Sequence, residues 1–422
     1  MTMASVFALV DCDHFYVSCE RVFDPSLREV PVAILSNNDG CIIARSAEVK
    51  ALGVPTGGPY FKYERLLARH GARVFSSNYA LYGDMSQRVM QVLRQTAPEV
   101  EVYSIDEAFL HLADTRLPVD QAREVRRRVR RWTGIPVSIG LGPTKTLAKI
   151  ATHFAKRHPE VEGVFDLTHR RDVDDLLGLV HVGEVWGIGP QYTRRLLARG
   201  IETARQLRDA HDAWIKKHLT IVGLRTVYEL RGISCLPLDQ VRPAKKGITC
   251  SRSFGEPVVV LAGLKEAVAA YVTRAAEKLR AQTSLAATLC VFITTKTFGK
   301  GPHYHNSYTV TLPEPNAYTP DLIRYAHRCL EKIYRPGYRY KKAGVMLTGI
   351  QPATLRQGHL FLQADHQGNQ ALMEAVDAIN KRWGRGTVFF AASGTQRPWS
   401  MRQQQHSKRY TTRWDEVPEA RA

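Results

Sequence analysis

A short apolar segment that ends in acidic residues does most to limit how this chain can fold. Residues 6–10 (VFALV) are apolar without interruption, and Asp11 follows them directly. A continuous apolar run of this length is typical of a strand buried on both faces. It predicts a central strand of a covered sheet, with a carboxylate at the strand's end.

The pattern that follows predicts an α/β domain over roughly the first 165 residues. Apolar, β-branched runs alternate with a segment that has apolar residues at helical spacing, and Gly142 with Pro143 ends one of the runs. The expected elements are a hairpin with a tight turn over residues 31–44, strands at 101–112 and 137–141, and a helix at 144–156.

The second half of the chain predicts a helical section, a linker and a separate small domain. Residues 172–232 are expected to be helical, and residues 243–247 form a basic linker bounded by Pro and Gly. A β-α-β-β-α-β domain follows, with strands at 247–256, 288–296, 306–312 and 340–350 and helices at 264–282 and 319–333. The polar residues after this domain are expected to be partly ordered.

Composition points to a polyanionic partner. Lys and Arg number 59 against 40 Asp and Glu, a formal net charge of +19, which favours nucleic acid or an anionic membrane surface. Six arginines in residues 121–131 form either a solvated helix face or a phosphate-facing surface. The first residues lack a signal-peptide pattern. Seven scattered cysteines without a Cys-x-x-Cys pair indicate neither a disulfide framework nor a zinc site, and favour the cytoplasm.

Three carboxylates suggest a metal-dependent reaction. Asp11 follows one predicted strand, and the pair Asp106 and Glu107 lies on another. Magnesium-dependent nucleotidyl transfer needs carboxylates that hold two hard cations. Adjacent strand residues point to opposite faces, so Asp106 and Glu107 can share a site only if the backbone turns or bulges there. Without further context, the same residues could be surface acids.

The context is a resemblance that extends from about residue 5 to the C-terminus. Residues 11–20 (DCDHFYVSCE), 103–109 (YSIDEAF) and 137–151 (VSIGLGPTKTLAKIA) resemble, in order and spacing, three motifs of the Y-family lesion-bypass DNA polymerases. The resemblance implies an α/β and α+β right-hand polymerase. Its expected domains are a palm (1–20 and 81–168), fingers (21–80), a helix-hairpin-helix thumb (169–240), a little finger (244–352) and a C-terminal region (353–422).

The resemblance also implies an active site. Asp11, Asp106 and Glu107 would be the catalytic acids, and with the Cys12 carbonyl they would hold two Mg²⁺ ions. Tyr16 matches the steric gate that excludes a ribose, although it could equally be a core aromatic. Asp13 is expected to be structural. The expected triphosphate ligands are Arg45, Lys50 and Lys156, with Lys50 standing where many relatives have an arginine.

Further segments indicate contacts with DNA and with a sliding clamp. Residues 185–190 (VWGIGP) resemble a helix-hairpin-helix loop, whose glycines let backbone N–H groups approach a phosphate. The expected DNA-binding residues are Gly187, Gly189, Lys245, Lys246 and Arg252, with Lys296 as a further candidate. Gln357, Leu360 and Phe361 resemble a clamp-binding peptide, although Gly358 and His359 are atypical and the segment could instead pack on its own domain.

Residues 35–41, 44–53, 399–401 and 410–414 favour the UmuC branch of the family. That branch implies an error-prone polymerase of the SOS response, located in the cytoplasm at the nucleoid. Its partners would be primer-template DNA, dNTP, the clamp, a UmuD′-like dimer and a RecA filament, and no membrane. The alternatives are a stand-alone DinB-type polymerase, a non-catalytic DNA-binding relative, and a membrane binder. No basic amphipathic helix with aromatic anchors supports the last of these.

Overall fold

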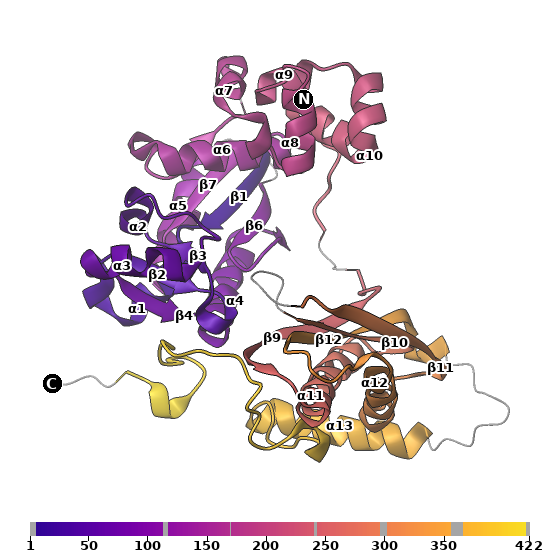
Figure 1. Cartoon of the computed structure of the whole chain (residues 1–422). Coiled ribbons are helices and arrows are strands. Elements are labelled where there is room, and N and C mark those ends of the chain that lie inside the picture. Colours follow the sequence, from indigo (N-terminus) through magenta and orange to yellow (C-terminus); the bar gives the residue numbers. More distant parts are fainter. Residues whose placement is uncertain are drawn as a thin grey trace. The chain divides into compact units, whose positions relative to one another are not determined.

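The computed structural model describes residues 6–112, 117–168, 170–239, 243–295, 302–355 and 366–418. The chain divides into two compact units (Figure 1). The first unit comprises Met1–Leu35, Cys41–Arg242 and Gln405–Ala422, and the second comprises Ser36–Gly40 and Pro243–Gln404. The first unit is therefore built from the beginning and the end of the chain.

A five-stranded sheet organises the first unit, and its strand order is β5-β6-β1-β7-β8. The central strand β1 pairs antiparallel with β6 and β7, and β7 pairs parallel with β8. The bounds are β1 (Val6–Cys12), β5 (Glu99–Val102), β6 (Glu107–Leu112), β7 (Val137–Gly142) and β8 (Val164–Asp166). The predicted buried central strand is confirmed, while the segment expected over 101–112 is a hairpin of two strands, β5 and β6.

Helices cover both faces of this sheet, which explains the uninterrupted apolar run. Leu9 of β1 packs with Ala148 of the helix α6 (Lys145–Arg157). Ala8 and Val10 face the other way, into a core formed with three further helices. These helices are α1 (Phe15–Phe23), α4 (Tyr79–Thr96) and α5 (Pro118–Thr133). Successive strand residues thus reach different layers, and both layers are apolar.

The contact between α6 and β7 is closer than side chains normally allow. A Cβ at Gly140 would lie far inside contact distance of the Thr152 nitrogen and the Ala148 oxygen, and a Cβ at Gly142 would meet the Ala148 nitrogen. The helix backbone therefore lies directly against the strand. Thr144 caps α6, because its hydroxyl accepts from the Leu147 N–H at 3.2 Å.

A smaller three-stranded sheet, in the order β3-β2-β4, lies beside two short helices. Its strands are β2 (Val32–Leu35), β3 (Ile42–Arg45) and β4 (Arg73–Ser76), and the helices are α2 (Ala47–Ala51) and α3 (Tyr60–Arg69). The predicted β2–β3 hairpin is present. Its expected tight turn is wrong, because the longer connection contains a 3₁₀ turn at Asn37–Asp39 with Asn38 in the left-handed region (φ 62°).

The predicted helical section packs on the far side of α6. Its helices are α7 (Val173–Leu179), α8 (Pro190–Leu197), α9 (Ala204–Asp209) and α10 (Asp212–Leu230), and they share a core with Leu147, Ile150 and Phe154 of α6. The carboxylate of Glu229, fully buried in α10, accepts from the Thr146 N–H at 3.1 Å. This contact fixes the end of α10 against the start of α6.

The second unit contains the expected β-α-β-β-α-β domain. Its sheet has the order β11-β10-β12-β9, with every neighbouring pair antiparallel. Its elements are β9 (Ile248–Val258), α11 (Leu261–Arg280), β10 (Ser284–Thr295), β11 (His305–Asn316), α12 (Thr319–Ile333) and β12 (Tyr340–Pro352). Both helices contribute to one apolar core with the sheet.

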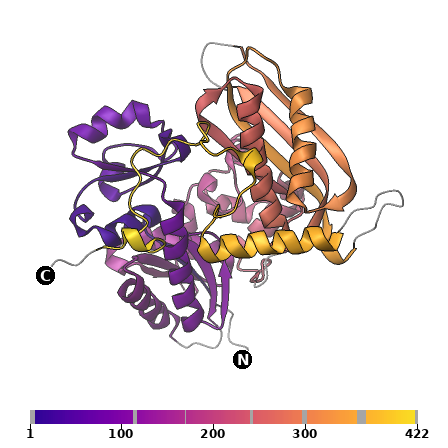
Figure 2. The same cartoon turned by 90° about the horizontal axis from the view of Figure 1, so that it is seen from below.

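One further helix was not anticipated from the sequence. The helix α13 (His366–Trp383) runs crosswise below α11 and α12 (Figures 1 and 2). Arg280 of α11 joins it through a two-pronged ion pair to Asp377, with nitrogen–oxygen distances of 2.7 and 2.8 Å. Among helices in the described ranges, none is long and apolar enough to cross a membrane.

The α6–β7 contact leads to a stability prediction. Gly140→Ala should lower the free energy of unfolding of the first unit by about 2 kcal/mol or more, because the helix must move off the strand. Gly178→Ala in α7 is the matched control, because a Cβ there meets nothing within 4 Å. Denaturant unfolding of the two variants measures the difference. Equal midpoints would show that the close contact contributes nothing.

Candidate active site

The strand register brings the predicted acids to one edge of the central sheet. Asp11 is near the end of β1, and its direct neighbours across the sheet are Glu107 on β6 and Ser138 on β7. The Cys12 N–H donates to the carbonyl of Asp106 at 2.8 Å. Backbone pairing alone therefore places three carboxylates around the end of β1.

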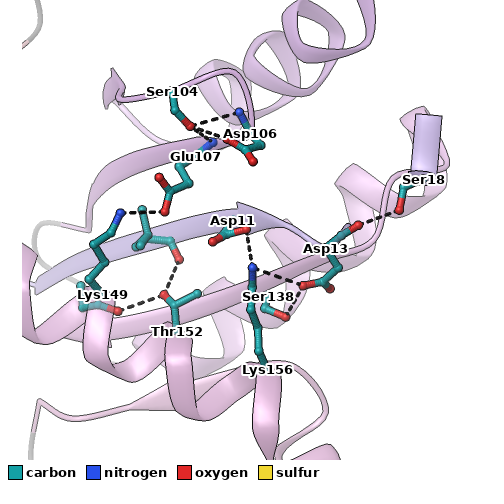
Figure 3. Close-up of polar contacts among 12 residues, drawn as sticks. Asp11, Asp13, Ser18, Ser104, Asp106, Glu107, Ser138, Lys149, Thr152 and Lys156 are labelled. Carbon is teal, nitrogen blue, oxygen red and sulfur yellow. Dashed lines mark hydrogen bonds and ion pairs between the residues drawn. The ribbon is translucent and has the colours of Figure 1, made fainter. Parts of the chain in front are cut away.

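A side-chain-supported turn lets Asp106 and Glu107 serve the same site. The hydroxyl of Ser104 accepts from the N–H groups of Asp106 and Glu107, at 3.2 and 3.0 Å, and donates to the Asp106 carboxylate. The N–H groups of Tyr103 and Ser104 both donate to the Glu107 carbonyl at 3.1 Å. The constraint stated from the sequence is met because the backbone turns before β6 begins (Figure 3).

Two lysines of α6 face these acids (Figure 3). Lys149 Nζ lies 2.8 Å from Glu107 Oε1, and Lys156 Nζ lies 2.5 Å from Asp11 Oδ1 and 3.9 Å from Asp13 Oδ1. The lysines are seven residues apart, which is two turns, so they share one helix face. Sequence reasoning selected Lys156 and missed Lys149, although the spacing of the two lysines was a usable signal.

Burial and mutual repulsion perturb the charges of the site. Burial raises the pKa of Asp11 to about 6, Lys156 opposes that rise, and Glu107 and Asp106 add to it. Burial works against the charge of Lys156, yet Asp11, Asp13 and Glu107 hold its pKa above the ordinary lysine value. Burial also raises the pKa of the Cys12 thiol. The acids thus form a negative cluster in which positive charge is favoured.

An open cavity of about 670 Å³ gathers the residues predicted for catalysis, metal binding, sugar selection and triphosphate binding. Arg45, on β3, lines it, and its guanidinium donates to the Val54 carbonyl. Lys50, on α2, lines it from the same side and is exposed. The predicted residues that line the cavity are Asp11, Cys12, Tyr16, Arg45, Lys50, Asp106, Glu107 and Lys156, and the others are His14, Phe15, Ile43, Ala44, Thr56 and Ile105.

Tyr16 is held by packing and also reaches the cavity. Its ring stacks on Tyr82 with centroids 4.5 Å apart and a 15° tilt, and it meets Tyr79 edge-on at 6.0 Å. Burial raises the pKa of Tyr16 to about 12, so the phenol stays neutral. The two interpretations of this residue, core aromatic and cavity wall, are thus compatible.

The donor chemistry of the site fits magnesium. Carboxylate and carbonyl oxygens are the ligands that this hard cation takes. Within the described ranges, no group of three or more His, Cys, Asp or Glu side chains is arranged to hold an ion as it stands. Asp11 and Glu107 each form an ion pair with a lysine ammonium.

Within the described ranges, the other predicted residues do not line the cavity. Gly187 (φ 88°) and Gly189 are exposed in the loop before α8, and Pro190 occupies the first turn of that helix. In the second unit, Lys245 and Lys246 precede β9 and Arg252 lies on it, all exposed. Lys296 and the clamp residues Gln357, Leu360 and Phe361 lie outside the described residues.

Sequence families match three parts of the chain. Residues 10–153 match the impB/mucB/samB family, and residues 245–360 match the C-terminal domain of that family. Residues 370–420 match a domain of unknown function, DUF4113. The first match spans the acidic sheet edge and most of α6, and the second spans the β-α-β-β-α-β domain.

Individual relatives extend over nearly the whole chain. Protein ImpB of Salmonella typhimurium is 45% identical, covering 99% of this chain and 100% of its own length. Protein UmuC of the same species (strain LT2) is 45% identical over 98% and 99%. DNA polymerase IV of Moorella thermoacetica is 31% identical over 92% and 96%.

Solved structures share the fold. A Y-family DNA polymerase chimera of Dbh and Dpo4 has a TM-score of 0.65 at 20% identity, covering 82% of this chain and 99% of its own. A ternary complex of Dbh has a TM-score of 0.56, also at 20% identity, over 81% and 98%. The expected right-hand architecture is confirmed at the level of the fold. The chain belongs to the impB/mucB/samB family of Y-family DNA polymerases, enzymes that copy past damaged template bases.

Proposed function

We propose that this protein extends a primer opposite lesions during the SOS response, by a two-metal reaction in the cavity at the end of β1. The main supporting observation is that three carboxylates, Lys156 and Tyr16 line that one cavity, and that Lys149 pairs with one of the carboxylates. This proposal goes beyond family membership because it assigns the chemistry to named residues. The reaction would take place beside Asp11, whose pKa is raised to about 6 by burial.

The acids would position the reacting groups. Asp11, Asp106, Glu107 and the Cys12 carbonyl would hold two Mg²⁺ ions, which would supply Lewis-acid activation of the primer 3′-hydroxyl and charge stabilisation for the pyrophosphate that leaves the incoming nucleotide. Ser104 fixes the direction of the Asp106 carboxylate through the hydrogen bond between them. Asp11 and Glu107 need only release their lysines to serve as ligands.

The basic residues would hold the triphosphate. Lys156, once free of Asp11, remains on the cavity wall beside Arg45 and Lys50. Each ammonium binds phosphate as a point charge, whereas Arg45 adds a planar donor group. The ring of Tyr16 would lie against the sugar and leave no space for a 2′-hydroxyl.

The DNA contacts are proposed from exposed donors in each unit. The loop with Gly187 and Gly189 offers backbone N–H groups to a phosphate without regard to base sequence. Lys245, Lys246 and Arg252 would contact further phosphates. The chain's net charge of +19 supports this interpretation. Work on DNA would place the protein in the cytoplasm at the nucleoid.

A UmuD′-like dimer, a RecA filament and the sliding clamp are proposed partners. Their support is the likeness to UmuC, together with the peptide at residues 357–361. The second candidate function is a stand-alone DinB-type polymerase. Its support is the 31% identity to a DNA polymerase IV. Primer extension by the purified chain, with and without a UmuD′-like dimer, separates the two. The cavity's three carboxylates argue against a non-catalytic relative.

Removing one carboxylate tests the catalytic assignment. Asp106→Asn or Asp11→Asn should lower primer extension with Mg²⁺ at least about a hundredfold, because a neutral amide is a poor ligand for a hard cation. DNA binding should persist. Asp84→Asn is the matched control, since Asp84 forms only a surface ion pair with Arg88. Turnover within tenfold of wild type in both site variants would contradict the assignment.

Shortening Tyr16 tests the sugar assignment. Tyr16→Ala should raise ribonucleotide incorporation relative to deoxyribonucleotide, because a methyl group leaves space for the 2′-hydroxyl. Tyr16→Phe keeps the ring and should keep the selection. The ratio of kcat/KM for the two sugars is the measurement, made on variants with a normal melting temperature. A purely structural residue would lose stability without a change in that ratio.

Changing two apolar residues tests the clamp peptide. Leu360→Ala with Phe361→Ala should leave unassisted extension unchanged and cut clamp-stimulated synthesis at least about tenfold, which corresponds to about 1.4 kcal/mol of binding. Leu355→Ala is the control, because that side chain is exposed just before the peptide. Equal losses with and without the clamp would mean that the peptide stabilises its own domain.

A further inference from the structure

A segment near the end of the chain packs against α1, which carries Tyr16, and α4, which carries Tyr82. This docking segment, residues 405–410, belongs to the first unit with α1 and α4. Its backbone pairs with the end of β4. The Ser76 N–H donates to the Gln405 carbonyl at 2.8 Å, and His406 forms a parallel bridge with Ser76. The segment is thus anchored immediately before α4 begins.

The residue that caps α4 also holds the docking segment. The Asn78 side-chain oxygen accepts from the Leu81 N–H at 3.3 Å and so caps the helix. The amide group of Asn78 donates to the Ser407 hydroxyl at 2.9 Å and to the Lys408 carbonyl at 3.1 Å. One fully buried side chain therefore fixes both the start of α4 and the course of the docking segment.

Ser407 completes the environment of a buried acid on α1. Glu20 is 2% exposed, and its Oε1 accepts from the Ser407 hydroxyl at 2.9 Å and from the Tyr82 hydroxyl at 2.6 Å. Burial raises the pKa of Glu20 to about 7, and the two hydroxyl donors oppose that rise. Removing either donor leaves the buried carboxylate less well compensated, which is unfavourable in an apolar surrounding.

The same network reaches the cavity wall. Tyr82 is fully buried and stacks on Tyr16, and Glu20 follows Tyr16 by one turn on α1. The hydroxyl and ring of Tyr82 thus connect the acid to the back of the Tyr16 ring. At the end of α1, Phe23 stacks on Tyr410 of the docking segment with centroids 4.8 Å apart and a 7° tilt.

We infer that Ser407 is a positioning residue for sugar selection, holding the Tyr16 ring in place through Glu20 and Tyr82. The inference rests on the proposed role of Tyr16 and gives a task to part of the region that matches a domain of unknown function. A ring excludes one hydroxyl group only if it cannot yield by a fraction of an ångström. The docking segment supplies that rigidity from behind, without contacting the nucleotide.

Removing the Ser407 hydroxyl in the full chain tests this inference. Ser407→Ala should lower the ratio of kcat/KM for deoxyribonucleotide over ribonucleotide at least about fivefold, while kcat/KM for deoxyribonucleotide changes less than about twofold. Ser400→Ala is the matched control, because its exposed hydroxyl bonds only the Arg397 carbonyl in the second unit. That variant should keep the wild-type ratio.

Tyr82→Phe provides a second route, because it removes the other donor to Glu20 and keeps the stacked ring. It should lower the ratio as Ser407→Ala does, and the double variant should lose less than the product of the two single effects. This variant also decides the matter if Ser407→Ala fails to fold. Independent, multiplying effects would mean that the two hydroxyls do not act through one network.

Tyr16→Ala, measured in the same assay, distinguishes the positioning role of Ser407 from the proposed role of Tyr16 in sugar selection. If Tyr16→Ala leaves sugar choice unchanged, the proposed role of Tyr16 is wrong. If Tyr16→Ala relaxes sugar choice while Ser407→Ala and Tyr82→Phe lower only the melting temperature, or lower both substrates equally, the positioning role of Ser407 is overturned.

Discussion

The direct contact of α6 with β7 at Gly140 and Gly142 is the constraint on which the rest of the first unit depends. It lays the helix close enough to the sheet for Lys149 and Lys156 to reach the acids at the end of β1. The opposite face of α6 forms the core of the following helices. One backbone contact therefore positions the lysines that pair with the acids and also positions the surface on which the helical section packs.

The lysines explain how three neighbouring carboxylates are tolerated in a half-buried site. Each ammonium offsets the repulsion among the acids, so the cluster can persist without any other cation nearby. Burial raises the pKa of Asp11 to about 6, although Lys156 opposes that rise.

Local patterns predicted the elements well and the contacts between distant segments poorly. The apolar run 6–10, the helix after Thr144 and the β-α-β-β-α-β order follow from periodicity and turn residues, which act over a few positions. The sequence predicted that the backbone turns or bulges at Asp106 if Asp106 and Glu107 share a site, but it did not indicate that Ser104 would support the turn. The lysine spacing could have drawn attention to Lys149, but its pairing with Glu107 has no local signal, and neither has the bond between Ser407 and Glu20, because each joins residues far apart in the chain. The helix α13 was missed because its apolar stripe is short and its surroundings are polar.

The discontinuity of the first unit has a consequence for synthesis on the ribosome. Residues 1–242 emerge first and contain the whole cavity, yet Glu20 and Asn78 bond residues that follow the complete second unit. At about 5–20 residues per second, roughly 8–30 s separate the two events. During that interval a nascent chain carries its acids and its nucleotide pocket but not the bonds behind Tyr82. The bonds behind Tyr82 can therefore form only after the ribosome has translated past residue 404.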